Sequence, residues 1–145
     1  MAVASLSCRM IATGQALRNT TPKLVDPVQL VARAESGDGY AQGLLSQGYR
    51  RGIWGFPKDP MNAARWATLS MDQGHPFGFY ERALLDLAID RETNAFARAS
   101  GLAKEGLQGM RGLARTGDMF AQKYLADMLH LGIGSKPSQS EAALW

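Results

Sequence analysis

The side chains that could carry out catalysis are few and scattered in this sequence. The two histidines, His75 and His130, are far apart along the chain, and the single cysteine is Cys8. Asp86 and Asp90 are one helical turn apart, a spacing that fits a solvated helix face better than an acid pair. Catalysis needs a reacting group beside a base and an orienting group. The spacing indicates neither such a constellation nor a metal site, and we expect no cofactor.

Two glycine-bearing segments deserve comparison with phosphate-binding loops: GIWGF at residues 52–56 and GIG at residues 132–134. A phosphate loop follows a strand and ends in Gly-Lys-Ser or Gly-Lys-Thr. Neither segment is preceded by a strand pattern or followed by that tripeptide. We therefore interpret both as connections between helices.

The bulk composition predicts one globular, helical domain. The chain has 145 residues, of which 46% are hydrophobic and 20% charged. Alanine and leucine are abundant, while valine and isoleucine are scarce, which favours helices over strands. The net charge is only +3 and the basic residues are scattered, so no nucleic-acid partner is indicated. No apolar run has the length of a membrane span.

Residues 1–25 form a Ser/Thr-rich lead-in without acidic residues. The opening MAVASLSCRMIA faintly resembles a targeting segment, but it lacks a basic start and Arg9 interrupts its apolar stretch. We expect a poorly packed segment here and a folded domain over residues 26–145. The sequence does not identify a compartment. A cytoplasmic location is the default, and a periplasmic or secreted one would accompany a trimmed targeting segment.

An internal repeat runs through this domain. The segment ESGDGYAQGLLSQGYRRGI, from Glu35, aligns with RTGDMFAQKYLADMLHLGI, from Arg115, at a constant offset of 80 residues. Two units of about 40 residues fit that offset, and a degenerate middle unit begins near Gly74, with Phe77 in the place of Tyr40. The units are predicted over residues 38–74, 75–117 and 118–145, each as two helices joined by a loop, which bears glycines in the first and third units but has lost them in the middle one.

The glycines divide into two groups in this interpretation. Gly52 and Gly132 stand at helix ends, where a positive φ angle is predicted. Gly43 lies inside a helix, so its replacement by alanine is expected to be tolerated or stabilising. The long second helix of the middle unit is expected to break near Gly106 or Gly109.

The repeat resembles the Sel-one-like repeat, a relative of the tetratricopeptide repeat. The resemblance covers residues 34–145 and rests on Ala41, Leu45, Ser46, Tyr49, Gly52, Gly55, Asp59, Ala63, Trp66 and Gly74. The chain departs from the family pattern at Ser46 and Ala126, which replace a glycine, and at Leu129, which replaces a tyrosine. The resemblance implies an all-α, right-handed α/α solenoid of helix–turn–helix units. It also implies an adaptor, a regulator, or a bacterial secretion-linked or envelope factor.

We therefore expect a non-enzymatic scaffold that binds another protein or a peptide on the inner face of the first helices. The candidate binding residues are Tyr40, Gln42, Gln47, Arg50, Tyr80, Glu81, Gln122, Asp127 and His130. Arg50 and Tyr80 are the expected exposed anchors, because arginine and tyrosine are frequent hot spots. The aromatic rings of Tyr40, Phe77 and Phe120 could equally pack between units. An enzyme or a small-ligand-binding domain is the alternative, and the oligomeric state is left open.

Overall fold

The computed structural model describes residues 25–89 and 94–145. Within these two ranges the chain forms seven α-helices and no strand, which confirms the all-α expectation. The helices are α2 (Pro27–Glu35), α3 (Gly39–Arg51), α4 (Pro60–Asp72), α5 (Pro76–Ile89), α6 (Ala95–Arg115), α7 (Met119–Leu131) and α8 (Gln139–Ala142). Cys8 and Asp90, and nearly all of the predicted lead-in, lie outside the described residues.

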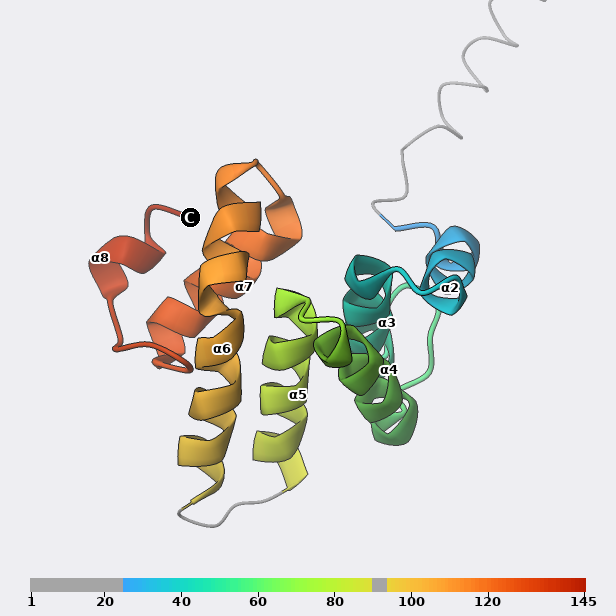
Figure 1. The fold of residues 1–145 in the computed structure, drawn as a ribbon, viewed down its shortest axis with the longest axis horizontal. Helices are drawn as coiled ribbons and strands as arrows, with labels where there is room; N and C mark the ends of the chain where they lie inside the picture. Colours follow the sequence, from blue (N-terminus) through green and yellow to red (C-terminus); the bar gives the residue numbers. More distant parts are fainter. Residues whose placement is uncertain (1–24, 90–93) are drawn as a thin grey trace, which may run out of the picture.

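The helices pack in chain order. Each contacts the next, and α3 also contacts α5. Figure 1 shows α2, α3 and α4 at one end of the molecule, α6, α7 and α8 at the other, and α5 between the two groups. The central position of α5 brings the first helices of all three predicted units close to one another.

Local sequence signals account for the helix boundaries. The Asp59 carboxylate caps α4 by accepting hydrogen bonds from two N–H groups of its first turn, and Pro60 takes the first helical position. Asp38 and Asp118 cap α3 and α7 in the same manner, each accepting the N–H three residues later. The expected left-handed helix ends are confirmed, with φ angles of 66° and 70° at Gly52 and Gly132.

The 80-residue offset also appears in the tertiary contacts. The Gln42 carboxamide donates to the Ala34 carbonyl oxygen at 3.0 Å. Its equivalent, Gln122, donates to the Ala114 carbonyl oxygen at 3.1 Å. Both bonds run from the first helix of a unit to the end of the preceding helix. The two segments that match in sequence are therefore held to their neighbours in the same way.

Gly43 has a packing role that the sequence interpretation missed, and the expectation that alanine would be tolerated there is wrong. A Cβ atom added at Gly43 would lie 2.4 Å from the Cβ of Phe77. Gly78 is tighter still, because a Cβ there would lie 2.2 Å from the backbone nitrogen of Met71. These glycines let α5 approach α3 and α4 closely, so they are required by neighbouring helices rather than by their own conformation.

The expectation that the long helix α6 breaks near Gly106 or Gly109 is wrong. It is continuous over 21 residues, and Gly106 and Gly109 face α5. A Cβ at Gly106 would lie 3.0 Å from the Phe79 Cβ, and one at Gly109 would lie 3.2 Å from Pro76. The glycines therefore accommodate the start of α5, and the packing against that helix outweighs their weak helix propensity.

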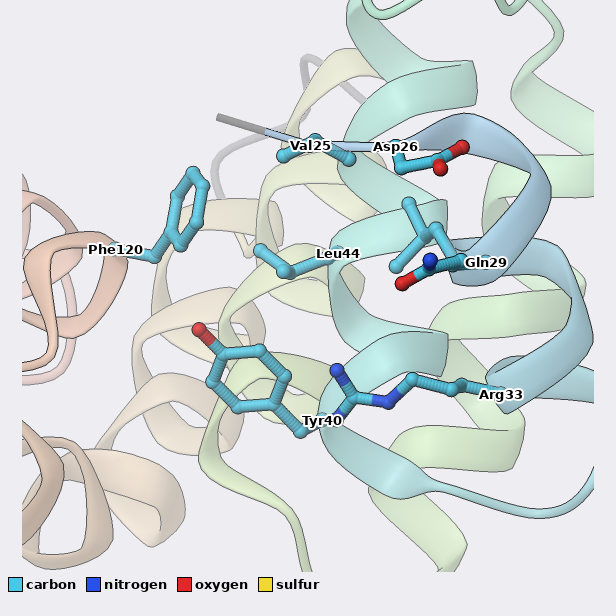
Figure 2. A pocket seen from close by; sticks show the side chains of 8 residues that line it. Val25, Asp26, Gln29, Arg33, Tyr40, Leu44 and Phe120 are labelled. Atoms are coloured by element: carbon cyan, nitrogen blue, oxygen red, sulfur yellow. The ribbon is translucent and has the colours of Figure 1, made fainter. Parts of the chain in front are cut away.

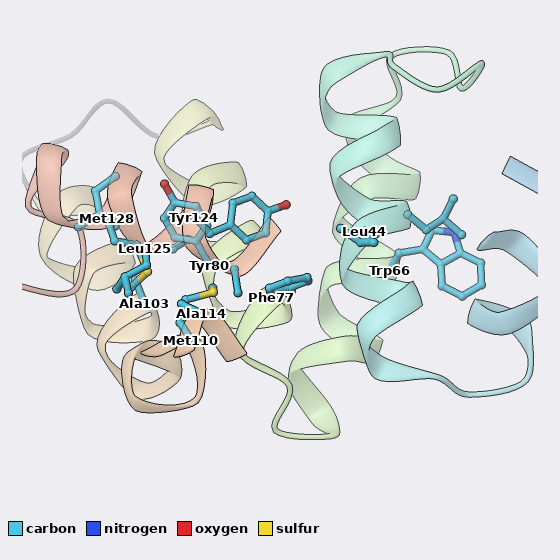
Figure 3. Packing of buried hydrophobic residues seen from close by; sticks show 14 of the residues in the cluster. Leu44, Trp66, Phe77, Tyr80, Ala103, Met110, Ala114, Tyr124, Leu125 and Met128 are labelled. Carbon is cyan, nitrogen blue, oxygen red and sulfur yellow. The ribbon is translucent and has the colours of Figure 1, made fainter. Parts of the chain in front are cut away.

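One main hydrophobic core extends through all the units. Figure 3 shows Leu44 and Trp66 on one side of it, and Tyr80, Tyr124 and Met128 on the other. The Phe77 ring bridges the two sides, with its centroid 5.0 Å from that of Tyr40 and 4.9 Å from that of Tyr124. The expectation that aromatic rings pack between units is confirmed for Tyr40 and Phe77.

Candidate functional site

A pocket of about 260 Å³ opens where α3, α5 and α7 meet. We call it the three-helix pocket. Its lining residues are Gln47, Arg50, Arg51, Tyr80, Leu84, Lys123, Tyr124, Asp127 and Leu131. The pocket thus takes side chains from the first helix of every predicted unit.

Several of the lining residues occupy equivalent places in the predicted repeat. Gln47 and Asp127 are separated by the 80-residue offset, and so are Arg51 and Leu131. Leu84 has the same relation to Gln47 as Phe77 has to Tyr40 in the middle unit. The predicted repeat gives the three helices equivalent positions, and packing such helices side by side would place these positions around a common space.

A buried ion cluster forms the base of the pocket. The Glu81 side chain is 0% exposed and accepts two hydrogen bonds from Arg50, at 2.6 Å from Nε and 3.0 Å from Nη2. The Tyr124 hydroxyl donates to Glu81 Oε1 at 2.6 Å. One carboxylate on α5 is therefore tied to α3 by a bidentate guanidinium and to α7 by a phenol.

The environment of this cluster raises the pKa values of Arg50 and Tyr124. Burial alone lowers the pKa of Arg50, but the hydrogen bonds and charge of Glu81 outweigh it and the net pKa is raised. Burial raises the pKa of the Tyr124 hydroxyl well above its ordinary value, and the adjacent Glu81 charge adds to that increase. Tyr124 therefore stays protonated and acts as a hydrogen-bond donor.

Gln47 carries a polar atom that the described part of the chain leaves without a partner. Gln47 is one of the residues that line the pocket, it is 2% exposed, and its Oε1 atom has no hydrogen-bond partner among residues 25–89 and 94–145. A buried acceptor without a partner destabilises the folded state by about 1–3 kcal/mol. Gln42, on the same helix and 4% exposed, has both ends of its carboxamide bonded. Gln47 is therefore the exception on α3.

The charges around the pocket leave a surplus of one positive charge. The positive charges are those of Arg50, Arg51 and Lys123, and the negative charges are those of Glu81 and Asp127. Lys123 pairs with Asp127 at 2.7 Å, and Arg50 pairs with Glu81. Arg51 is exposed at the end of α3 and has no ion pair within the described part of the chain. An anionic group in the pocket would meet the free guanidinium of Arg51.

A second pocket, of about 310 Å³, lies beside α2. Its lining residues are Val25, Asp26, Gln29, Leu30, Arg33, Tyr40, Leu44 and Phe120 (Figure 2). The Tyr40 hydroxyl donates to Asp118 at 2.8 Å, and Arg33 donates to the Asp38 carboxylate. Burial raises the pKa of Tyr40, and the hydrogen bond to Asp118 raises it further. The main polar groups of this pocket are thus engaged within the chain, which makes the three-helix pocket the better candidate.

Four of the predicted binding residues meet in the three-helix pocket: Gln47, Arg50, Tyr80 and Asp127. Glu81 lies in the ion cluster beneath them. The other four are placed elsewhere. Tyr40 lines the second pocket, Gln42 and Gln122 bond to helix-end carbonyls, and the exposed His130 has its Nδ1 3.0 Å from Gln139 Oε1.

The expectation that Arg50 and Tyr80 are exposed, unattached anchors is wrong. Tyr80 is 2% exposed because α7 covers it, with its ring centroid 5.1 Å from that of Tyr124. Arg50 is held by Glu81, and its side chain is 23% exposed. Burial raises the pKa of the Tyr80 hydroxyl, and the charges of Asp127 and Glu81 contribute to that shift. Neither residue behaves as a simple surface side chain.

The sequence interpretation missed Arg51, Leu84, Lys123, Tyr124 and Leu131 as pocket residues. The repeat offset contained a usable signal for Leu84, since it is equivalent to the predicted residue Gln47, whereas Leu131 is equivalent to Arg51, which was itself missed. Lys123 and Tyr124 had no such signal, because their first-unit equivalents are the core positions Gly43 and Leu44.

Other kinds of site were also sought in the described ranges. Residues 25–89 and 94–145 contain no group of three or more His, Cys, Asp or Glu side chains that could hold a metal ion. No helix in the same ranges is long and apolar enough to cross a membrane. Comparison of the chain with protein-family models, with curated proteins and with solved structures gives no match.

Proposed function

We propose that this chain is a right-handed α/α solenoid of the Sel-one-like kind that binds a peptide segment of another protein in the three-helix pocket. One observation carries the proposal: equivalent faces of α3, α5 and α7 line a single pocket. Repeat proteins form extended binding surfaces in this way, because each unit contributes the same helix face. Membership of that family is supported by the residue spacing and by the paired contacts of Gln42 and Gln122.

The ion cluster supports a binding role over a catalytic one. Glu81, the most buried carboxylate near the pocket, is occupied by Arg50 and Tyr124. Asp127 is occupied by Lys123. A general base needs access to the proton that it removes, whereas these carboxylates are positioned to fix helices. The cluster therefore provides a rigid base for recognition.

The test is a selection of short random peptides on the immobilised chain, followed by fluorescence anisotropy of the enriched peptides. Leu131, which lines the pocket and is 54% exposed, is replaced by tryptophan to fill the space. The matched control is Leu69→Trp on α4, outside the pocket, where the leucine is 37% exposed. Both variants should melt like the parent chain, because the substituted positions are exposed.

Leu131→Trp is expected to weaken peptide binding at least about tenfold, and Leu69→Trp to leave it unchanged. Failure to enrich any peptide, or equal binding by all three proteins, would overturn the proposal. Stabilisation of the parent chain by a metabolite, lost in Leu131→Trp and without any bound peptide, would favour a small-ligand site in the same pocket.

A further inference from the structure

The unpaired carboxamide of Gln47 specifies the chemistry of the missing partner group. A carboxamide both accepts and donates hydrogen bonds, and neither end of Gln47 has a partner among residues 25–89 and 94–145. Gln42 shows that α3 can satisfy a glutamine completely where a helix-end carbonyl and another side chain are near. Gln47 is instead one of the residues that line the three-helix pocket. A bound group that donates to Oε1 would complete it.

The charge around the pocket restricts which donor can fill this role. Lysine and arginine side chains donate hydrogen bonds but are positively charged, and the pocket already carries a surplus of one positive charge. A neutral donor fits better, and a main-chain N–H is the neutral donor that every peptide offers except at proline. In a helix most N–H groups are used internally, so the segment that pairs with Gln47 must be extended there.

We infer that the three-helix pocket binds an extended acidic segment, whose main-chain amide pairs with the Gln47 carboxamide and whose carboxylate side chain pairs with Arg51. The inference rests on the proposed function and adds the chemistry of the partner. Arg51 supplies the charge complementarity, because it is the cation of the pocket that pairs with no carboxylate in the described ranges. The apolar side chains of Leu84 and Leu131 supply contacts for neighbouring residues of the segment.

The experiment uses pools of synthetic peptides that are acetylated at one end and amidated at the other. Each pool has one fixed central residue, either glutamate, glutamine or lysine, and degenerate positions on both sides. Blocking both ends removes the terminal charges, so the central side chain is the only fixed difference between the pools. Retention is measured on the immobilised full chain and on its variants.

Two pairs of variants separate the contacts. Gln47→Leu removes the unpaired carboxamide, and Gln42→Leu is its control, an equally buried glutamine of the same helix that lies outside the pocket. Arg51→Gln removes the free guanidinium, and Arg115→Gln is its control. Both arginines are exposed in the last turn of a helix, so the loss of favourable interaction with the helix dipole is matched.

The parent chain is expected to retain the glutamate pool at least about tenfold better than the glutamine pool, and the lysine pool least. Arg51→Gln should make the glutamate and glutamine pools equal, while Arg115→Gln keeps the preference. Gln47→Leu should lower retention of the glutamate pool about tenfold without lowering the melting temperature. Gln42→Leu should lower the melting temperature and leave retention of the glutamate pool unchanged.

The outcomes distinguish this inference from the proposed function. Retention of no pool by the parent chain would overturn both. Retention that Leu131→Trp abolishes, but that is equal for the glutamate and glutamine pools, would overturn the acidic specificity and leave peptide binding standing. Unchanged retention by Gln47→Leu would overturn the main-chain pairing and likewise leave peptide binding standing.

Discussion

Glycine-to-alanine substitutions in three helices test the close packing of α5 directly. Gly43 in α3 and Gly101 in α6 are interior helical positions, where alanine improves helix propensity by about 1 kcal/mol, and Gly78 is in the first turn of α5. Their surroundings differ. An added Cβ would meet nothing within 4 Å at Gly101, the Phe77 Cβ at 2.4 Å from Gly43, and a backbone nitrogen at 2.2 Å from Gly78.

The expected free energies of unfolding follow from these distances. Gly101→Ala should stabilise the chain by about 0.5–1 kcal/mol, because only the backbone entropy changes. At Gly43 the same gain is opposed by an overpacking cost of about 1–3 kcal/mol, which gives a net loss of up to about 2 kcal/mol. Gly78→Ala should lower the free energy of unfolding more than Gly43→Ala does. At Gly78 a backbone atom blocks the new methyl group, so α4 and α5 must separate.

Urea denaturation followed by far-UV circular dichroism measures all three differences, and Gly101→Ala serves as the control for propensity. The order of stability is expected to be Gly101→Ala, parent, Gly43→Ala and Gly78→Ala, with thermal midpoints separated by about 4 °C per kcal/mol. A gain of similar size at all three positions would refute the reasoning, since it would mean that α5 does not approach α3 and α4 this closely.

Three further predictions concern polar groups. Glu81→Gln should destabilise the chain by about 3 kcal/mol in chemical denaturation, because it leaves a largely buried guanidinium without its counter-charge. Gln42→Leu should cost about 1–3 kcal/mol while Gln47→Leu costs nothing or stabilises, since only Gln42 has partners to lose; equal losses would contradict an unpaired Gln47. Hydrogen bonds from the backbone and side chain of Asn62 lower the pKa of Asp59 below 3.8, so its stabilising contribution is complete above that ordinary value and is lost as the pH falls through the folded-state pKa. Asp59→Asn keeps a capping oxygen and removes the titration, so its unfolding free energy, measured by denaturation at stepped acidic pH, should fall less steeply than that of the parent.

Features that depend on a few neighbouring residues could be predicted from the sequence. Gly52 and Gly132 identified helix ends, because a positive φ angle is a local requirement, and Asp59 followed by Pro60 is an equally local signal for a helix start. The 80-residue self-match predicted equivalent helices, and the bonds of Gln42 and Gln122 to helix-end carbonyls recur at that offset, although the sequence had assigned both residues to partner binding.

Features that depend on a distant helix could not be predicted in this way. Gly43 and Gly106 look like weak points in isolated helices, and only the approach of α5 explains them. Tyr80 and Arg50 were assigned to a free face because the sequence does not show that α7 packs against Tyr80 or that Glu81 binds Arg50. Four of the pocket residues were nevertheless predicted, since the repeat places equivalent helix faces together even where it does not reveal their burial.

The ion cluster couples the shape of the three-helix pocket to the stability of the fold. Glu81 holds α3 through Arg50 and α7 through Tyr124, so any change in the cluster shifts two walls of the pocket together. A loss of binding in Glu81→Gln would therefore not show that Glu81 contacts a partner. Gln47 and Arg51 are different, because their polar groups bond to no other described residue. Substitution there changes the surface offered to a partner while the three helices keep their positions, and recognition can then be measured separately from folding.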